Sequence, residues 1–376
     1  MGGQNSKPPE FLSVLANKQV KVGEKITLQC KTNIEKLSAT WKKNDQKLMC
    51  VEGKHTIRNV GTTFILEIEN AEETDEGKYT LILEHEKGSG SCSAMVIVEL
   101  NEWRRIDWEQ EMVIRELKSF KISNDSVKEL RFLLCGPIGS GKSSVINSIK
   151  TVFENRQFIN CLAASEVGQS FSEHYRRFTV GSGKSGCLPF AFYDVMGLEA
   201  GDLKGVRTDD IIKALKGHVP AEYKFHPLFS ITEDNKHYIR SPSVNDKIHC
   251  LVNVVPADKI TLVDQRVIQK MSDIREAASR LRIPQLVLMT KVDKTCLMTK
   301  ADLSKIYRSR KIREKMLECS VRLGVPMNCI FPIKSYHDET QLDPKINCLI
   351  LNALRQMILS ANDYVEPCSG KLKYAD

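Results

Sequence analysis

The feature that most constrains the fold of this chain is a glycine loop that separates a predicted strand from a predicted helix. The loop, GPIGSGKSS at residues 136–144, fits the pattern G-x-x-x-x-G-K-[ST] at every fixed position. An apolar run, LRFLLC, precedes it at 130–135, and a helical stripe follows it at Val145, Ile146 and Ile149. The backbone N–H groups of such a loop and the positive end of the helix dipole hold an oxyanion chain. We therefore expect a domain that binds a polyphosphate.

Each part of the loop has an expected role. Lys142 is expected to reach the β- and γ-phosphates of a nucleotide, and the Ser143 hydroxyl to ligate Mg²⁺. The expected phosphate-side contacts are Gly136, Gly139, Ser140, Gly141, Lys142, Ser143 and Ser144. The alternative is a Gly- and Ser-rich turn that matches the pattern by chance, which the flanking strand and helix do not favour.

A second phosphate-side element is DVMG at residues 194–197, which follows the apolar run LPFAFY at 188–193. In this D-x-x-G pattern Asp194 is expected to hold the magnesium shell, and the backbone N–H of Gly197 to contact a γ-phosphate. The pattern is common by chance. Its position after a buried strand and downstream of the glycine loop supports the assignment.

A further Mg²⁺ ligand is expected in the segment before the predicted strand 175–180, where a switch should fall. Ser172 is the preferred hydroxyl and Ser170 is the alternative, because both lie just upstream of that strand. Small hydroxyl residues are common in loops, so position along the chain is the only support for this ligand.

The choice of base depends on TKVD at residues 290–293, directly after the apolar run QLVLM at 285–289. Asp293 is expected to accept hydrogen bonds from N1–H and the 2-amino group of guanine. Adenine offers neither donor, so it would leave a buried carboxylate unpaired. A base-capping loop is expected directly after the predicted strand 330–333. The residues expected to contact the base are Thr290, Lys291, Asp293, Lys334 and Ser335. The predicted cofactors are therefore GTP or GDP, and Mg²⁺.

The order of elements predicts an α/β doubly wound P-loop GTPase-like domain, preceded by an all-β immunoglobulin-like sandwich. The predicted strands of the α/β domain are 130–135, 175–180, 188–193, 247–255, 285–289 and 330–333, and its last helix is 348–359. In such sheets the ligand lies at the carboxyl ends of the strands. The expected division is a leader at 1–7, the sandwich at 8–100, a helical linker at 101–127, the nucleotide domain at 128–362 and a tail at 363–376.

The segment before the linker has the alternating runs and regular turns of a β sandwich. Cys30, Trp41 and the DEGKY stretch ending at Tyr79 resemble the cysteine, tryptophan and tyrosine corner of the intracellular I-set immunoglobulin domains. The second cysteine of that group is expected two residues after Tyr79, where this chain has Leu81. The resemblance therefore implies a core without the central disulfide, in which Leu81 packs against Trp41. A pairing of Cys92 with Cys30 stays open but is not the preferred arrangement. Such modules are spacers or docking surfaces, so protein partners are implied.

Bulk composition is that of an ordinary soluble protein. Hydrophobic residues make up 41% and charged residues 27% of the 376 residues, and no apolar run approaches the ~20 residues of a membrane-spanning helix. The twelve cysteines include no C-x-x-C pair, which argues against a zinc ribbon or a disulfide scaffold and favours reduced thiols. The net charge of +8 is a mild basic bias. Basic residues at 308–315 are interleaved with Glu314 and Glu318, so nucleic acid is not a favoured partner.

The first residues, MGGQNSK, fit the N-myristoylation pattern M-G-x-x-x-[ST], with Gly2 as the acceptor. A disordered polar leader is the alternative. One acyl chain binds a bilayer only marginally, and this segment has a single basic residue, Lys7, and no cysteine for palmitate. Any membrane contact is therefore expected to be reversible, and the predicted location is cytoplasmic with a peripheral membrane fraction.

The α/β part resembles the interferon-induced protein 44 family. The resemblance rests on the glycine loop and on four further runs, WRRIDW at 103–108, LKSF at 117–120, LPF leading to DVMGLE within 188–199, and PIKSY at 332–336. It covers roughly residues 101–362 and implies a cytoplasmic, interferon-responsive GTP-binding protein with an antiviral or growth-restraining role. Many relatives carry a different N-terminal domain, so functions tied to that domain are not implied here.

Two residues argue against rapid hydrolysis. Fast GTPase switches place a glutamine after the D-x-x-G glycine to orient the attacking water, whereas this chain has Leu198. Ile138 replaces a small residue in the glycine loop and would crowd an entering arginine finger. The expected function is therefore a slow GTPase switch or scaffold in innate antiviral defence. The alternative is a non-enzymatic interaction protein in which the nucleotide is only structural.

Overall fold

The computed structural model describes residues 8–86, 88–158, 174–181, 186–201, 204–226 and 228–369. The chain forms two compact units. The first comprises Met1–Arg105 with Tyr307–Arg310, and the second comprises Ile106–Ile306 with Lys311–Asp376. In the parts of the chain that are described, no helix combines the length and the apolar character of a membrane span.

The first unit is a sandwich of two β sheets. Its strands are β1 (Phe11–Ser13), β2 (Lys18–Lys21), β3 (Ile26–Thr32), β4 (Ser38–Lys43), β5 (Gln46–Lys47), β6 (His55–Val60), β7 (Thr63–Ile68), β8 (Gly77–His85) and β9 (Gly88–Glu99), with a 3₁₀ turn η1 at Glu73–Asp75. One sheet has the order β1-β3-β7-β6 and the other β2-β9-β8-β4-β5. Neighbouring strands are antiparallel except β2 and β9. Buried and less buried residues alternate along β3 and β7, because one face of each strand lies in the core.

The core of this unit is built around Trp41 and Leu81, which lie opposite each other on β4 and β8. Trp41 is 3% and Leu81 0% exposed, so apolar packing occupies the place of a second cysteine. The hydroxyl of Tyr79 donates to the carbonyl of Asp75 at 2.9 Å and forms the expected tyrosine corner. The immunoglobulin-like sandwich is therefore confirmed.

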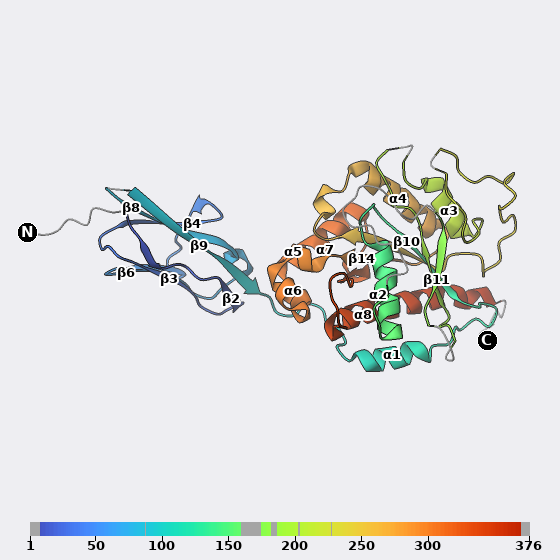
Figure 1. Cartoon of the computed structure of the whole chain (residues 1–376), viewed down its shortest axis with the longest axis horizontal. Coiled ribbons are helices and arrows are strands. Elements are labelled where there is room, and N and C mark those ends of the chain that lie inside the picture. Colours follow the sequence, from blue (N-terminus) through green and yellow to red (C-terminus); the bar gives the residue numbers. More distant parts are fainter. Residues whose placement is uncertain are drawn as a thin grey trace, which may run out of the picture. The chain divides into compact units, whose positions relative to one another are not determined.

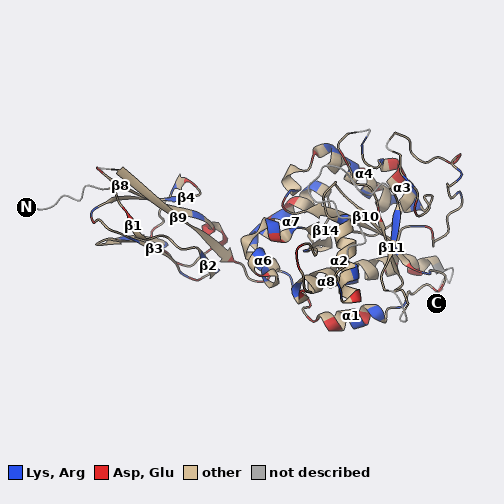
Figure 2. Cartoon of the chain, in the orientation of Figure 1, with Lys and Arg blue, Asp and Glu red and all other residues tan. Residues whose placement is uncertain are grey.

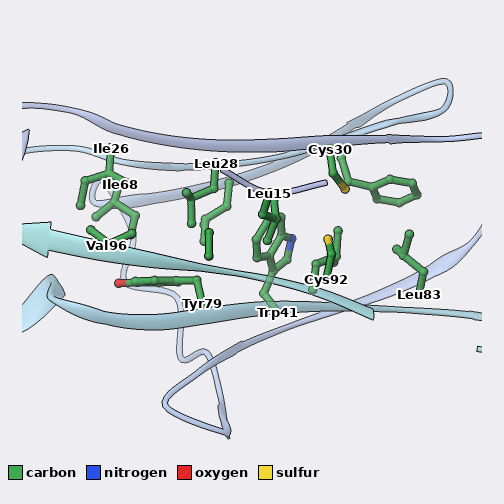
Figure 3. Packing of buried hydrophobic residues seen from close by; sticks show 14 of the residues in the cluster. Leu15, Ile26, Leu28, Cys30, Trp41, Ile68, Tyr79, Leu83, Cys92 and Val96 are labelled. Atoms are coloured by element: carbon green, nitrogen blue, oxygen red, sulfur yellow. The ribbon is translucent and has the colours of Figure 1, made fainter. Parts of the chain in front are cut away.

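In this core Cys30 faces Cys92 (Figure 3), an arrangement that was not preferred from the sequence. Cys30 and Cys92 are both buried, and their sulfur atoms point toward each other from the two sheets (Figure 3). Cys92 lies directly opposite Leu81 in the pairing of β8 with β9, so the two side chains share the inner face. The pairing register of β9 decides this orientation, and the alternation of residues along the strand does not reveal that register.

The second unit is organised on a six-stranded sheet. Its strands are β10 (Leu130–Cys135), β11 (Arg176–Thr179), β12 (Phe190–Asp194), β13 (Cys250–Pro256), β14 (Gln285–Thr290) and β15 (Ile330–Pro332), in the spatial order β11-β12-β10-β13-β14-β15. β11 is antiparallel to β12, and the other neighbouring pairs are parallel. The residues of β12 and β13 are buried throughout, as in parallel strands covered on both faces. The α/β class and the six predicted strands are confirmed.

Helices cover both faces of this sheet (Figure 1). They are α1 (Gln110–Lys118), α2 (Lys142–Glu154), α3 (Thr208–Lys216), α4 (Gln265–Arg280), α5 (Val292–Thr295), α6 (Leu297–Ala301), α7 (Arg310–Leu323) and α8 (Pro344–Val365), with 3₁₀ turns η3 (Ile260–Leu262), η4 (Leu303–Arg308), η5 (Met327–Cys329) and η6 (Glu366–Ser369). α1 and α2 pack with α8, and α3 packs with α4. This alternation of strand and helix brings the carboxyl ends of the parallel strands to one edge of the sheet.

The last helix is longer than its predicted range of 348–359. It begins at Pro344, where the carboxylate of Asp343 accepts from the N–H of Lys345 at 2.7 Å and caps the helix. It ends at Val365, beyond the expected tail boundary at 362.

The segment expected as a linker at 101–127 lies mostly in the second unit, which begins at Ile106. Within it, α1 buries Val113 and Leu117. Its Glu116 pairs with Arg355 of α8 at 2.9 Å. The helical part of the expected linker thus packs on α8.

Charges of both signs lie along α7 (Figure 2). Lys315 and Glu318 of this helix form an ion pair at 2.8 Å, which neutralises part of its basic character. A mixed face of this kind is typical of a solvated helix.

Candidate nucleotide-binding site

The glycine loop joins β10 to the N-terminus of α2, and its backbone has a conformation that glycine favours. Gly139 and Gly141 have φ values of +71° and +98°. A Cβ on Gly136 would lie 2.1 Å from the carbonyl oxygen of Val254 on β13, so the backbone approach there excludes a side chain. Gly141 is the N-cap of α2, where no side chain caps the helix. The first N–H groups of α2 therefore face the loop, as in anion-binding helix termini.

Lys142 lies inside the loop and is 7% exposed. Its ammonium donates to the carbonyl oxygens of Gly136 at 3.2 Å and Pro137 at 3.3 Å. Burial lowers the pKa of Lys142, and the charge of Asp194 opposes that shift. A desolvated cation that is held by neutral carbonyls gains from the approach of an anion.

Ser143 and Asp194 are brought together at the same edge. The Ser143 hydroxyl donates to Oδ2 of Asp194 at 2.7 Å. They meet because β10 and β12 are parallel neighbours. A hydroxyl and a carboxylate are oxygen ligands that Mg²⁺ uses beside phosphate and water. Across the described ranges no group of three or more His, Cys, Asp or Glu residues could hold a metal.

Three polar side chains around this edge have shielded atoms without a hydrogen-bond partner. They are the hydroxyls of Ser140 and Ser335 and both amide atoms of Asn253. Such groups cost roughly 1–3 kcal/mol each unless a ligand or water pairs them. Sequence reasoning missed Asn253, which pairs with Cys135 in the sheet, one position before the loop. The signal was a single amide in the apolar run CLVNVV.

The D-x-x-G segment lies directly on the glycine loop. The N–H of Leu198 donates to the carbonyl of Gly136 at 3.0 Å, and the N–H of Ile138 donates to the carbonyl of Leu198 at 3.4 Å. A Cβ on Gly197 would lie 2.4 Å from Cγ1 of Ile138, so glycine is required at this contact. Lys270 of α4 donates to the carbonyl of Glu199 at 3.0 Å. Leu198 is 1% exposed and contributes to the core.

The TKVD segment also bonds to the glycine loop. The Thr290 hydroxyl donates to the carbonyl of Ser140 at 2.6 Å, and the Lys291 ammonium donates to the carbonyl of Gly139 at 2.8 Å. Lys291 has a φ of +59°, a left-handed conformation that turns the chain from β14 into α5. Asp293 follows in the first turn of α5 and is half-buried.

The loop after β15 approaches Asp293. Lys334 forms an ion pair with Glu339 at 2.6 Å. Burial opposes the charge of Lys334, but Glu339 raises its pKa, and the negative charge of Asp293 adds to that effect. The N–H of Tyr336 donates to the Ser148 hydroxyl of α2 at 2.9 Å and anchors the loop. Glu339 was also missed, because no sequence pattern connects it to Lys334.

The expected residues therefore fall into two groups. Those of the glycine loop, the D-x-x-G segment, the TKVD segment and the loop after β15 lie at the carboxyl edge of one sheet. Ser172, its alternative Ser170 and Gly2 lie outside the described residues.

Comparison with known proteins covers each unit separately. Residues 9–98 match the family model of the Immunoglobulin I-set domain. The crystal structure of the titin M3 domain is 25% identical over 24% of this chain and 95% of that chain, with a TM-score of 0.23. The class of the first unit rests on its strand pairing and on the family match.

Three curated relatives each match 255 residues, or 68%, of this chain. Interferon-induced protein 44 is 35% identical in Homo sapiens and 33% identical in Mus musculus, and interferon-induced protein 44-like of Homo sapiens is 33% identical. The matches cover 56–60% of the relatives, so this chain spans little more than half of their length. Over about two thirds of its length the chain is thus a homologue of the interferon-induced protein 44 family, and it also carries an immunoglobulin I-set domain.

Proposed function

We propose that the second unit is a P-loop GTPase-like domain that binds GTP or GDP together with Mg²⁺. The observation that carries this proposal is the convergence of three segments, 136–143, 194–198 and 290–293, at one edge of the sheet. Each segment alone is a short pattern. Direct hydrogen bonds join both of the later segments to the glycine loop, so phosphate-side and base-side elements form one continuous surface.

In this site the side chains have separate tasks. The Lys142 ammonium would donate to phosphate oxygens in place of the carbonyls of Gly136 and Pro137. Ser143 and Asp194 would hold Mg²⁺, whose charge neutralises the phosphates when it is bound. Ser140, Asn253 and Ser335 carry the unpaired polar atoms that a bound nucleotide or its water shell would satisfy.

The base is read by Asp293, and Lys291 would lie over the ring. The loop bearing Lys334 and Ser335 would close the far side of the base. A carboxylate acceptor selects guanine because N1–H and the 2-amino group are both donors. The predicted selectivity against adenine nucleotides is therefore at least tenfold, since the wrong base leaves the carboxylate unpaired.

Hydrolysis is proposed to be slow. Leu198 is apolar and buried in the core, so its side chain cannot orient a water. The place beside the D-x-x-G glycine is filled by Ile138, which contacts Gly197. An added arginine from another protein would raise the rate by about a thousandfold or more.

The relatives' names say that they are interferon-induced, and we propose the same setting here: a cytoplasmic switch or scaffold in innate antiviral defence. Its immunoglobulin-like unit would dock protein partners. A second candidate is an interaction protein in which nucleotide is only structural. The contacts of Leu198 with Gly136 and Ile138 favour it, because they already hold the D-x-x-G segment to the loop.

Titration calorimetry with GDP, GTP and ATP tests the nucleotide proposal. We expect GDP and GTP to bind and ATP to bind at least tenfold more weakly. Asp293→Asn should lose guanine binding, while Asp273→Asn, at an exposed position of α4, should not change it. Equal affinity for ATP and GTP in the unaltered chain would refute base selection by Asp293.

The Asp293→Asn variant also has a gain that distinguishes lost selectivity from misfolding. Xanthine carries a carbonyl where guanine carries the 2-amino group. The new amide can donate to that carbonyl, so this variant should bind xanthosine diphosphate more tightly than GDP. Single-turnover assays and partner binding in GDP and GTP then separate a switch from a structural nucleotide: no turnover and no nucleotide dependence would leave only the second candidate.

For the leader we propose N-myristoylation at Gly2 and reversible membrane contact. Labelling cells with an alkyne analogue of myristate should mark the chain and should fail with Gly2→Ala. Absence of label on the unaltered chain would refute N-myristoylation at Gly2.

A further inference from the structure

The first unit contains a pair of thiols at the centre of its core. Cys30 of β3 is 1% exposed and Cys92 of β9 is 8% exposed. β3 and β9 belong to different sheets, and Figure 3 shows the two sulfur atoms pointing toward each other beside Trp41. The nucleotide proposal uses neither residue.

Strand register explains why these two residues face each other. The family resemblance places a second cysteine at position 81, where this chain has leucine. Cys92 is the residue opposite Leu81 on the neighbouring strand β9. Directly opposed residues of an antiparallel pair share one face, so Cys92 presents a thiol to the core from one strand further along. Cys30 therefore has a partner, but on β9 rather than β8.

The two thiols also influence each other chemically. A hydrogen bond between them raises the pKa of Cys30 and lowers the pKa of Cys92 to about 7. Cys92 is therefore the thiol that ionises first, and a thiolate is the reactive form of cysteine.

We propose that Cys30 and Cys92 are a modification site: hydrogen peroxide converts them into a disulfide that joins the two sheets. The Cys92 thiolate attacks one peroxide oxygen, the O–O bond breaks, and a sulfenic acid and hydroxide form. The Cys30 sulfur then attacks the sulfenic sulfur, and its proton leaves with the departing hydroxide as water. In sum, two thiols and one peroxide give one disulfide and two waters.

The bond would stabilise the first unit against unfolding. It closes a loop of about 60 residues between β3 and β9, which restricts the unfolded chain. It also replaces two buried thiols without adding a polar group to the core.

Peptide mapping of the full chain tests the bond. The protein is treated with hydrogen peroxide, its remaining thiols are alkylated, and it is digested with trypsin without reduction. We expect one linked species that joins ITLQCK, residues 26–31, to residues 88–104. The exposed thiols of Cys50, Cys187 and Cys368 serve as controls for oxidation without this geometry. Recovery of Cys30 and Cys92 as separate peptides, with the exposed thiols oxidised, would overturn the proposal.

Thermal unfolding gives a second readout. Peroxide should raise the midpoint of the first unit by roughly 5 °C or more, and a reductant should reverse the rise. Cys92→Val keeps an apolar side chain of similar size and should abolish the shift, whereas Cys50→Ser should retain it. If Cys92→Val does not fold, the linked peptide in the unaltered chain still decides. An equal shift in Cys92→Val and the unaltered chain would refute the link.

Discussion

The interiors of the two units are organised in different ways. In the first unit, the inner faces of two mainly antiparallel sheets meet, and Trp41, Leu81 and Tyr79 fill the space between them. In the second unit, Lys142, Asp194 and other buried polar side chains gather at one edge of a mainly parallel sheet. Parallel strands bring all their carboxyl ends to that edge, whereas antiparallel strands alternate their ends. Substitutions at these core positions should therefore affect stability in the first unit, whereas substitutions at this edge should affect ligand binding in the second.

The largest expected effect is on stability, from Trp41→Ala. Trp41 is 3% exposed at the centre of the sandwich, so its loss should lower the free energy of unfolding of the first unit by about 3–5 kcal/mol. Urea unfolding followed by circular dichroism measures the change. Met49→Ala is the matched control, since Met49 is 81% exposed. If Trp41→Ala weakened GDP binding as strongly as it lowers stability, the proposed separation of roles would be wrong.

Acid should act on the second unit through His249, which is fully buried. Its Nδ1 accepts from the N–H of Arg131 at 3.1 Å, and its Nε2–H donates to the carbonyl of Val244. Burial lowers the pKa of His249 from 6.5 to about 4, so its neutral form is favoured in the folded state. Because the unfolded chain binds the extra proton first, stability is complete above pH 6.5 and falls between pH 6.5 and 4.

The free energy of unfolding of the second unit is expected to fall by about 3 kcal/mol between pH 6.5 and pH 4. Urea unfolding of the second unit at pH 7 and pH 4 checks it. His249→Gln should flatten the pH dependence even though it lowers stability at pH 7. If the free energy of unfolding fell as steeply with pH in that variant, groups other than His249 would cause the acid sensitivity.

Lys142→Ala should weaken binding without weakening the fold. The ammonium is desolvated and donates to two backbone carbonyls, so its removal should change the unfolding midpoint little. Loss of a charge-assisted contact to phosphate should reduce GTP affinity about 10–100-fold. Calorimetry and thermal unfolding on the same sample test both parts, and Lys150→Ala on the same helix is the control. A large fall in stability with unchanged affinity would make Lys142 a structural residue.

The smallest effect is expected from Glu339→Gln. Glu339 holds Lys334 by an ion pair, and Lys334 also feels the charge of Asp293. Without Glu339, Lys334 should compete for Asp293, and GDP affinity should fall several-fold, or about 1 kcal/mol. Asp338→Asn is the control, because the Asp338 side chain is 91% exposed.

The pH dependence of this pair follows from the pKa of Glu339. Burial opposes its charge, but Lys334 lowers the pKa of Glu339 below 4.5 overall. The contribution of the pair is therefore complete above pH 4.5 and is lost only as pH falls through the lower folded-state value. The change in GDP affinity between pH 7 and pH 5 should therefore be the same in the unaltered chain and in Glu339→Gln.

Short local patterns were sufficient for much of the site. The glycine loop, Asp194 and the TKVD segment each combine an apolar strand with polar residues at its end, and this combination is visible along the chain. The two residues that were missed lack such a pattern. Asn253 looks like an interruption of a strand, and Glu339 pairs with Lys334 across a loop that Tyr336 anchors to Ser148.

By itself the sequence determined the class of each unit, because the spacing of apolar residues and glycines limits which elements can form and bury a core. The tertiary structure decided which thiols face each other, how far α8 extends and which carbonyls hold Lys142. These features depend on strand register and on contacts between segments that are distant in the chain. The energies that select such contacts come from packing and burial in three dimensions, which no local pattern contains.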